Sequence, residues 1–373
     1  MKTRLNPANS GVLQRWRTSK NRWQIAQMLP ALGISLLLHS CASPGKLEPG
    51  AAAVDAKLRT AYDYALVDAN SQAISLAAMA ESLRSSDVIF IGEYHSNHAS
   101  HLFEMQLFAT LHQLTRATQR PIVLSMEMFN RDQQKILNDY LAGKIGERYL
   151  IEEAPTWKNY RAAYRPLIEY AKQHAIAVVA ANAASDIVRC IGRRGADYID
   201  QLEPDKRQAV AEQAFADIPG YKDKFMGVMA GANHTANERL QRSYLAQLSR
   251  DNTMAESIAR AYTETPNSII VHLSGTFHSE QSLGTVGALK RLQPTLKMSV
   301  ISPIHHTQTK TEPAYSEPRD APSISADATE KKDDFYYIIR PQPEEFVDED
   351  YMHKIHQKMF SNANKQADSC EKT

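Results

Sequence analysis

Short apolar runs alternate along this chain with longer segments of helical periodicity. The apolar runs cover residues 88–91, 122–124, 176–179, 269–273 and 298–301. Nearly every position in them is apolar, which is typical of strands buried on both faces of a parallel sheet. The pattern therefore predicts an α/β fold, in which a mostly parallel sheet is flanked by helices and joined by right-handed crossovers.

The segments between and after these runs complete the expected organisation. We expect helices over 98–115, 131–142, 157–173, 185–194, 237–262 and 282–292. No strand pattern occurs between residues 203 and 262, which predicts a helical insertion before the fourth strand. Residues 307–334 are rich in Pro, Ser, Thr, Lys and acidic residues and predict a disordered loop or linker. Residues 335–373 predict an edge strand followed by a charged helical tail.

The amino terminus has the pattern of an export signal. A basic segment ending at Arg22 precedes an apolar run over 28–38, which is too short to span a bilayer but has the length of a signal-peptide core. The sequence Leu38-His39-Ser40-Cys41 resembles the bacterial lipobox, whose cysteine receives the lipid. We therefore expect a signal peptide over 1–40, lipidation at Cys41 and a tether over 41–55; the alternative is an ordinary secretory signal.

The residues that follow the cysteine favour one location. Ala42 and Ser43 stand where an inner-membrane retention signal of Gram-negative lipoproteins would place Asp. We therefore predict a cell-envelope protein that is lipid-anchored, in the outer membrane.

Charge and cysteine content exclude two classes of protein. The net charge of +1, from 43 basic and 42 acidic residues, excludes a globally basic nucleic-acid binder. Three cysteines are too few for a disulfide scaffold. If Cys41 is lipidated, Cys190 and Cys370 remain, and we expect them not to pair. Cys190 lies in an apolar helical pattern and is predicted to be a buried, inert thiol.

Polar residues follow four of the five predicted strands. The first strand is followed by Glu93, Tyr94, His95 and His98, with His101 and Glu104 further on; the next three strands are followed by Glu127, Asn182 and the segment Gly275-Thr276-Phe277-His278. Because ligands in open α/β sheets bind beyond the carboxyl ends of the strands, we expect these side chains to share one edge of the sheet. His305 and His306, which follow the fifth strand, are expected to begin the loop.

Histidines and carboxylates at one edge leave three kinds of site open. Glu93, His95, Glu127 and His278 are suitable ligands for Zn, Mn or Fe. Alternatively, a histidine oriented by a carboxylate acts as a general base in metal-free hydrolysis. In a third arrangement, a polar rim holds the haem propionates while Tyr or His ligates the iron.

Two motifs give the sequence a family resemblance. Gly92-Glu93-Tyr94-His95 and Gly275-Thr276-Phe277-His278 resemble the paired GxxH motifs of the superfamily that joins TIKI proteases, TraB proteins and erythromycin esterases. Within it, the segments 126–129, 132–134, 180–183, 250–251 and 254–255 resemble the ChaN-like haem-binding lipoproteins. The match extends over residues 87–304. Asn182-Ala183-Ala184 departs from the expected Asn-Ala-Pro, which affects only local loop geometry.

The resemblance implies a haem-binding domain over 56–306 in a protein that aids haem and iron acquisition. Expected partners are haem, a membrane through the lipid anchor, envelope haem-transport proteins and a second copy of the chain, and no nucleic acid. Residues proposed to contact haem are His95, His278, Tyr94, His98, His101 and Tyr164, with Tyr160 as a further tyrosine. The proposed pocket walls are Phe129, Met128, Phe277, Phe225, Met226 and Met229.

Two other functions remain open. In the related esterases and proteases, the residues that match Glu93, His95, Glu127 and His278 form the active centre, so the alternative is a metal-dependent or histidine-based hydrolase, esterase-like or peptidase-like. In this case the same four residues are the catalytic set and the ligands of a divalent metal. The third reading is a tethered interaction domain.

Overall fold

The computed structural model describes residues 58–155, 157–229, 238–306, 333–365 and 370. The predicted signal peptide, Cys41, the tether and residues 307–332 of the predicted loop lie outside these ranges. None of the helices within them is long and apolar enough to cross a membrane.

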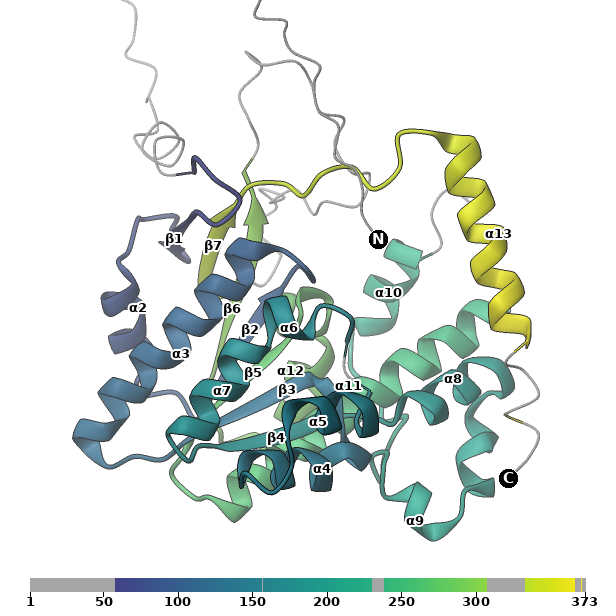
Figure 1. The fold of residues 1–373 in the computed structure, drawn as a ribbon, viewed down its shortest axis with the longest axis horizontal. Helices are drawn as coiled ribbons and strands as arrows, with labels where there is room; N and C mark the ends of the chain where they lie inside the picture. The colour runs from purple at the N-terminus through teal and green to yellow at the C-terminus, as the bar shows by residue number, and fades with distance from the viewer. Residues whose placement is uncertain (1–57, 156, 230–237, 307–332, 366–369, 371–373) are drawn as a thin grey trace, which may run out of the picture. The chain divides into compact units, whose positions relative to one another are not determined.

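The core of the fold is a seven-stranded, mostly parallel sheet (Figure 1). The strands are β1 (Tyr64–Asp68), β2 (Val88–Glu93), β3 (Ile122–Asn130), β4 (Ala177–Asn182), β5 (Ile269–Gly275), β6 (Met298–His305) and β7 (Phe335–Ile339). Their order across the sheet is β1-β7-β6-β2-β5-β3-β4. Only β1 pairs antiparallel, with β7. The predicted α/β class is confirmed.

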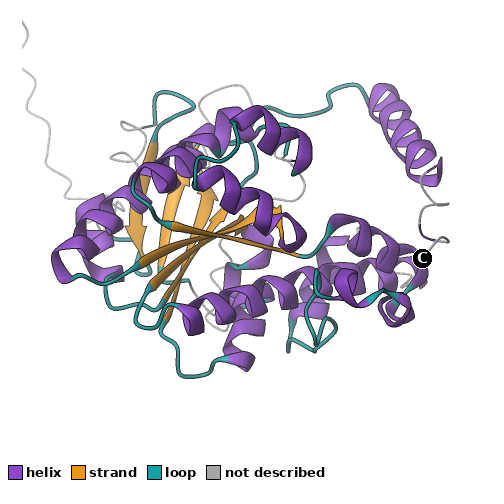
Figure 2. Cartoon of the chain, turned by 60° about the horizontal axis from the view of Figure 1, so that its bottom comes forward, coloured by secondary structure: helices purple, strands orange, loops and turns teal. Residues whose placement is uncertain are grey.

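Helices cover both faces of this sheet (Figure 2). The α-helices are α2 (Leu76–Leu83), α3 (His98–Thr118), α4 (Gln134–Leu141), α5 (Glu147–Glu153), α6 (Tyr160–Ala163), α7 (Arg165–Gln173), α8 (Ser185–Arg194), α9 (Pro204–Arg207), α10 (Tyr221–Met229), α11 (Glu238–Glu264), α12 (Gly284–Leu292) and α13 (Glu349–Lys365). The 3-10 helices are η1 (Arg131–Gln133), η2 (Ala196–Gln201), η3 (Thr276–His278) and η4 (Glu280–Ser282). Between β4 and β5 the described chain is helical, which confirms the predicted insertion.

Alternate residues of the central strands enter two different cores. In β2, Ile89 and Ile91 pack with α2 to α7, whereas Val88 and Phe90 pack with α10, α11 and α12. Both faces of such a strand are buried, so apolar residues are favoured at successive positions, which explains the continuous apolar sequence. Polar side chains are therefore concentrated where the strands end.

The position of β7 differs from the prediction. We expected residues 335–339 to form an edge strand, but β7 lies between β6 and β1, and the edge belongs to β1. The buried Tyr337 explains this position, because its hydroxyl donates a hydrogen bond of 2.6 Å to the carbonyl of Gly92. Similarly, His305 does not begin a loop, because it continues β6 and pairs with Ile339.

The prediction for the cysteines is also wrong. Cys190 and Cys370 form a disulfide, with Cα atoms 5.5 Å apart. Cys190 is buried as predicted, and Cys370 is buried in the same small core, formed mainly by α8, η2 and residues near Val210. The two cysteines are 180 residues apart in the sequence, so spacing could not reveal their contact.

Candidate functional site

The predicted polar residues meet at the carboxyl edge of the sheet because of the strand register. Glu93, the last residue of β2, is paired with Gly275, the last residue of β5. On the other side of β5, Met126 is paired with Leu273, which brings the next residue of β3, Glu127, to the same edge. Four strand ends were predicted to meet, and three of them contribute to one polar region through their register. The fourth, at the end of β4, joins it through Asn182, whose side chain donates to the carbonyl of Glu127.

Glu93 is the centre of the first cluster in this region. One carboxylate oxygen, Oε1, accepts hydrogen bonds from His95 Nδ1 at 2.7 Å and from the hydroxyl of Tyr164 at 2.6 Å. Its other oxygen, Oε2, lies 3.7 Å from Nδ1 of His101, which is 3.1 Å from Glu104 Oε2. Glu93 and Glu104 are both buried. The cluster thus combines two carboxylates, two histidines and a phenol.

The pKa values of the two carboxyl groups shift in opposite directions. Burial raises the pKa of Glu104 well above its usual value, and the charge of Glu93 raises it further. Burial also raises the pKa of Glu93, but a hydrogen bond from His95, another from Glu104 and the charge of His101 outweigh it, so the pKa of Glu93 is lowered. Two adjacent buried carboxyl groups cannot both ionise cheaply. Of the two carboxyl groups, Glu104 is therefore the one that holds its proton to the higher pH.

His95 is the member of this cluster that reaches solvent. Its side chain is 42% exposed, and Trp157 packs edge-on against it with ring centroids 4.6 Å apart. Burial lowers the pKa of His95, but the hydrogen bond to Glu93 and the charges of Glu127 and Glu93 reverse this, so its pKa is raised. Within the described chain, Nδ1 is fixed by Glu93 and Nε2 forms no hydrogen bond.

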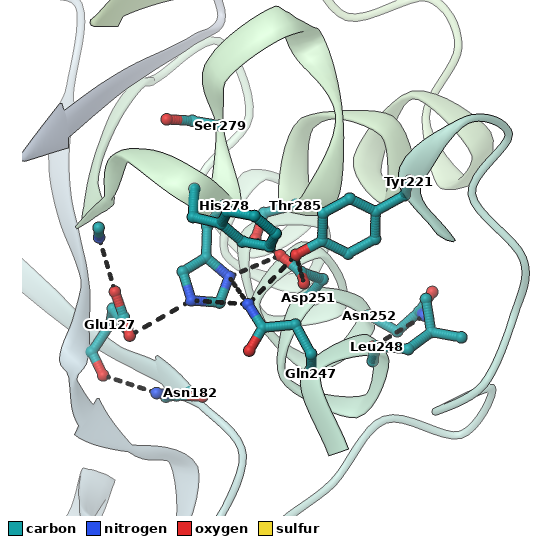
Figure 3. Close-up of polar contacts among 12 residues, drawn as sticks. Glu127, Asn182, Tyr221, Gln247, Leu248, Asp251, Asn252, His278, Ser279 and Thr285 are labelled. Carbon is teal, nitrogen blue, oxygen red and sulfur yellow. Dashed lines mark hydrogen bonds and ion pairs between the residues drawn. The ribbon is translucent and has the colours of Figure 1, made fainter. Parts of the chain in front are cut away.

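The second cluster is centred on His278 in η3 (Figure 3). Nδ1 of His278 donates to Asp251 Oδ1 at 2.8 Å, and Nε2 is 3.5 Å from Glu127 Oε1. Asp251 also accepts hydrogen bonds from the hydroxyls of Tyr221 and Thr285. Glu127 in turn accepts the backbone N–H of Gly275 at 2.8 Å, and its own carbonyl accepts from the side chain of Asn182. His278 is thus enclosed between two buried carboxylates.

This enclosure makes His278 a buried cation. Burial lowers the pKa of His278, but the charges of Asp251 and Glu127 outweigh it and raise the pKa to about 10. Burial raises the pKa of Glu127, whereas the charge of His278 and its hydrogen bond lower it far more. At neutral pH His278 is an imidazolium whose two nitrogens both face carboxylates. Ligation of a metal ion by either nitrogen of His278 would therefore require the loss of a proton that Asp251 and Glu127 stabilise.

Two further aromatic pairs involve residues that follow the end of β2, one pair partly buried and the other exposed. Tyr94 stacks on His305 with ring centroids 4.2 Å apart, and burial raises the pKa of Tyr94 to about 12. The exposed His98, at the first position of α3, stacks on Tyr62 at 5.1 Å. Together with His95 and Trp157, these rings form the aromatic rim of the site.

The six residues predicted to contact haem therefore fall into two groups. Tyr94, His95 and His98 lie at the aromatic rim, whereas His101, Tyr164 and His278 are buried and hydrogen-bonded to carboxylates. Of the remaining predicted residues, Met128, Phe129, Tyr160 and Phe225 are buried in the cores, Met226 and Phe277 are partly buried, and Met229 is exposed. Of the first group, His95 and His98 are exposed and Tyr94 is partly buried.

The four residues predicted to form a catalytic or metal centre are divided into two pairs, Glu93 with His95 and Glu127 with His278. Within the described chain, the group of three ligand atoms close enough to share an ion is instead Glu93, His101 and Glu104. A cavity of about 790 Å³ lies elsewhere, along β4, where Arg131, Lys172 and Glu264 contribute to its lining. None of the predicted site residues lines that cavity.

Sequence reasoning missed Asp251, Tyr221 and Gln247 as members of the site. They come from α10 and α11, which belong to the helical insertion. The available signal was segment 250–251, which the sequence analysis used only for the family resemblance. In the structure Asp251 is buried with Ser249, Asn252 and Thr253, and polar residues that are buried in a helix normally have a partner.

The fold and the site define a class of protein: an α/β protein with two GxxH motifs at the carboxyl edge of a parallel sheet. The chain belongs to the family described as "Haem-binding uptake, Tiki superfamily, ChaN", whose model matches residues 79–289. The family resemblance stated from the sequence is therefore confirmed. No curated protein matches the chain.

One solved structure, with a TM-score above 0.5, supports the fold. A structure described as "Cofacial heme binding to ChaN of Campylobacter jejuni" has a TM-score of 0.54 at 15% identity and covers 74% of this chain and 97% of that one. A Bacillus cereus protein has a TM-score of 0.40 at 12% identity, over 72% of this chain and 92% of its own. A mutant erythromycin esterase in its open conformation has a TM-score of 0.36 at 13% identity, over 65% and 77%.

Proposed function

We propose that this protein binds haem at the aromatic rim, with Nε2 of His95 as the ligand of the iron, and that it acts in haem and iron acquisition. The observation that carries the proposal is the state of the His95 ring, which is fixed through one nitrogen and open at the other. Membership in a family of haem-binding uptake proteins supports the choice of ligand.

The hydrogen bond between His95 and Glu93 is the arrangement that metal-ligating histidines normally use. A carboxylate that accepts the N–H of one ring nitrogen fixes the tautomer and orientation and makes the other nitrogen a better donor. Tyr164 holds Glu93 in place from the other side through its 2.6 Å hydrogen bond. The three side chains therefore hold a preorganised nitrogen donor, Nε2 of His95, beside Gly275 at the carboxyl edge of the sheet.

The rings around His95 suit a large flat ligand. Trp157 contacts the imidazole edge-on, and Tyr94 and His305 form a stacked pair at the same rim. Small-molecule sites are lined mainly by apolar and aromatic side chains with a few polar anchors, and the aromatic rim has that composition. An exposed face also leaves room for a second haem or a second copy of the chain.

We further propose that the protein is exported and anchored in the outer membrane by a lipid on Cys41, and that it exchanges haem with envelope transport partners. The basic segment before Arg22, the short apolar run and the lipobox support this location. The disulfide between Cys190 and Cys370 adds support, because disulfides persist in oxidising compartments and are rare in the cytosol.

The proposal is tested by loading the purified protein with haemin, removing free haemin by gel filtration, and measuring retained haem as the pyridine haemochrome. We expect a stoichiometric and reproducible ratio of haem to chain. A protein fraction without retained haem would overturn the proposal.

One observation favours hydrolysis as a second candidate function. His95, oriented by Glu93, lies against Gly275, and the His278 imidazolium contacts Glu127, which accepts the N–H of Gly275. A base and a positive charge thus lie near the same strand end. A panel of ester and peptide substrates tests it. Activity that disappears in His95→Ala supports a hydrolase, and equal inactivity of wild type and His95→Ala excludes one for the substrates tested.

A further inference from the structure

When both carboxyl groups of the first cluster are ionised, three of its buried polar atoms have no hydrogen-bond partner within the described chain. They are Oε2 of Glu93, Oε1 of Glu104 and Nε2 of His101, and each residue is more than nine-tenths buried. Buried polar groups are nearly always satisfied, because an unsatisfied one costs about 1–3 kcal/mol. Three such atoms in one cluster indicate that the cluster binds a ligand.

The charges of the cluster indicate that this ligand is a cation. Every ion pair that Glu93 and Glu104 make within the described ranges is with a histidine. Two buried carboxyl groups side by side without Lys or Arg are costly to ionise, unless a cation compensates them. A cation with two positive charges would allow both groups to be ionised.

The spacing fits a small transition-metal ion. Nδ1 of His101 is 3.1 Å from Glu104 Oε2 and 3.7 Å from Glu93 Oε2. Ligands about 2.0–2.1 Å from a tetrahedral ion lie about 3.3 Å from one another. The two measured separations bracket this value, and one ligand atom from each of the three residues lies within 4.8 Å of the others.

The elements that carry the three residues are held rigidly together. Glu93 ends β2, while His101 and Glu104 are three residues apart and lie on the same side of α3. The hydroxyl of Tyr337 contacts both the carbonyl of Gly92 and the hydroxyl of Ser100, which ties the start of α3 to the end of β2. The ligands therefore need no large rearrangement to meet around an ion.

We propose that Glu93, His101 and Glu104 form a site for one divalent transition-metal cation of the Zn, Mn or Fe(II) class. One imidazole nitrogen with two carboxylate oxygens suits these ions, whereas Ca²⁺ and Mg²⁺ prefer oxygen ligands alone. The site shares only Glu93 with the four residues that the two GxxH motifs suggest, and it does not depend on haem binding. Glu93 links the site to His95, because Oε2 faces the proposed ion while Oε1 keeps its hydrogen bond to that ring.

The test uses haem-free protein that has been treated with EDTA and then dialysed separately against Zn²⁺, Mn²⁺, Co²⁺ and, without oxygen, Fe²⁺. Metal content is measured by mass spectrometry after free ions are removed. We expect one equivalent per chain for at least one ion. Failure of all four ions to bind would overturn the proposal, whatever the outcome of the haem experiments.

Two variants and a matched control assign the bound ion to this cluster. Glu104→Gln and His101→Gln should each lower the metal affinity at least tenfold. His112→Gln should leave it unchanged, because His112 is on the same helix and similarly buried but contacts Tyr170. Unchanged affinity in both Glu104→Gln and His101→Gln would place the ion elsewhere and contradict the proposal.

A spectroscopic readout covers the case in which a variant fails to fold. Co²⁺ bound to the wild-type protein should show visible d–d bands of a site with a nitrogen ligand. EPR hyperfine coupling to ¹⁴N in the Mn²⁺ or Co²⁺ form should identify a histidine ligand. A bound ion with oxygen ligands alone would exclude His101 and overturn the assignment.

Discussion

Nε2 of His95 lies 2.7 Å from the position that a Cβ atom on Gly275 would occupy. Because Gly275 of the second GxxH motif has no side chain, the ring of His95 from the first motif occupies the space beside it. The two motifs, which are far apart in the sequence, act as one unit because β2 and β5 are neighbours in the sheet. This contact makes a direct prediction about the second glycine.

Gly275→Ala should lower the affinity for haemin roughly tenfold without unfolding the protein, because the added methyl group displaces the His95 ring. Haemin titrations followed by absorption, with circular dichroism as a fold check, measure both effects. Gly192→Ala is the control, since a Cβ there meets only Ala246, at an ordinary 3.6 Å. Equal affinities of Gly275→Ala and wild type would show that the ring position does not matter.

Haem binding through His95 should weaken as the pH falls. Iron needs the deprotonated nitrogen, and the carboxylate of Glu93 helps to raise the pKa of His95 above 6.5. Affinity should therefore decline on acidification through this raised pKa and be greatest on its alkaline side. Haemin titrations from pH 5 to pH 9 test this, with His95→Ala expected to show a flatter profile. A wild-type affinity that is independent of pH would argue against ligation by His95.

The buried pair of His278 and Asp251 should contribute strongly to stability. Removal of one partner from a buried ion pair costs about 3–5 kcal/mol, so Asp251→Asn should lower the free energy of unfolding by about that amount. Urea unfolding measures the change. Asp139→Asn is the control, because Asp139 pairs with exposed lysines, and it should leave stability unchanged. A stability loss no larger than that of the control would contradict the role of the pair.

The same histidine should make stability depend on pH. The pKa of His278 is about 10 in the folded protein and 6.5 when unpaired, so its stabilisation is complete below pH 6.5. It is lost as the pH rises from 6.5 to 10, because the unfolded chain then holds fewer protons than the folded one. Urea midpoints measured across this range should fall in the wild type and fall less in His278→Gln. Parallel curves for the two proteins would exclude this linkage.

The disulfide should be required for full stability. Cys370→Ser should lower the free energy of unfolding by about 2–4 kcal/mol, since the bond closes a long loop in the unfolded chain. Urea unfolding of wild type with and without reductant, beside Cys370→Ser, measures this. Reductant should have no further effect on the variant. A wild type that reductant leaves unchanged would contradict a structural role for the bond.

The sequence was sufficient to predict the parts of the fold that depend on local pattern. Strands buried on both faces are recognisable by their apolar runs, and the parallel arrangement then places Glu93, Glu127 and Gly275 at one edge. What could not be predicted depends on contacts between distant segments. Asp251 of α11 contacts His278, and Cys370 contacts Cys190 of α8 over a sequence separation of 180 residues. Neither contact follows from the spacing of residues in the sequence.

The sequence also could not predict that one part of the site is exposed and the other is buried. His95 and His278 occupy equivalent positions in two GxxH motifs, but one is 42% exposed and the other is enclosed by Glu127 and Asp251. The difference arises because α11 brings Asp251 against His278, whereas His95 contacts Glu93 and Trp157. The motif specifies the residues, and the neighbouring helix decides what each histidine can do.

The central claim is that His95 ligates haem iron, and a haemin titration followed at the Soret band tests it most directly. Wild type should show a shifted Soret band that saturates at a defined ratio, and His95→Ala should lose the shift and at least tenfold in affinity. His174→Ala, at an exposed histidine before the amino end of β4, should match wild type. An unchanged Soret band and affinity in His95→Ala would contradict the claim.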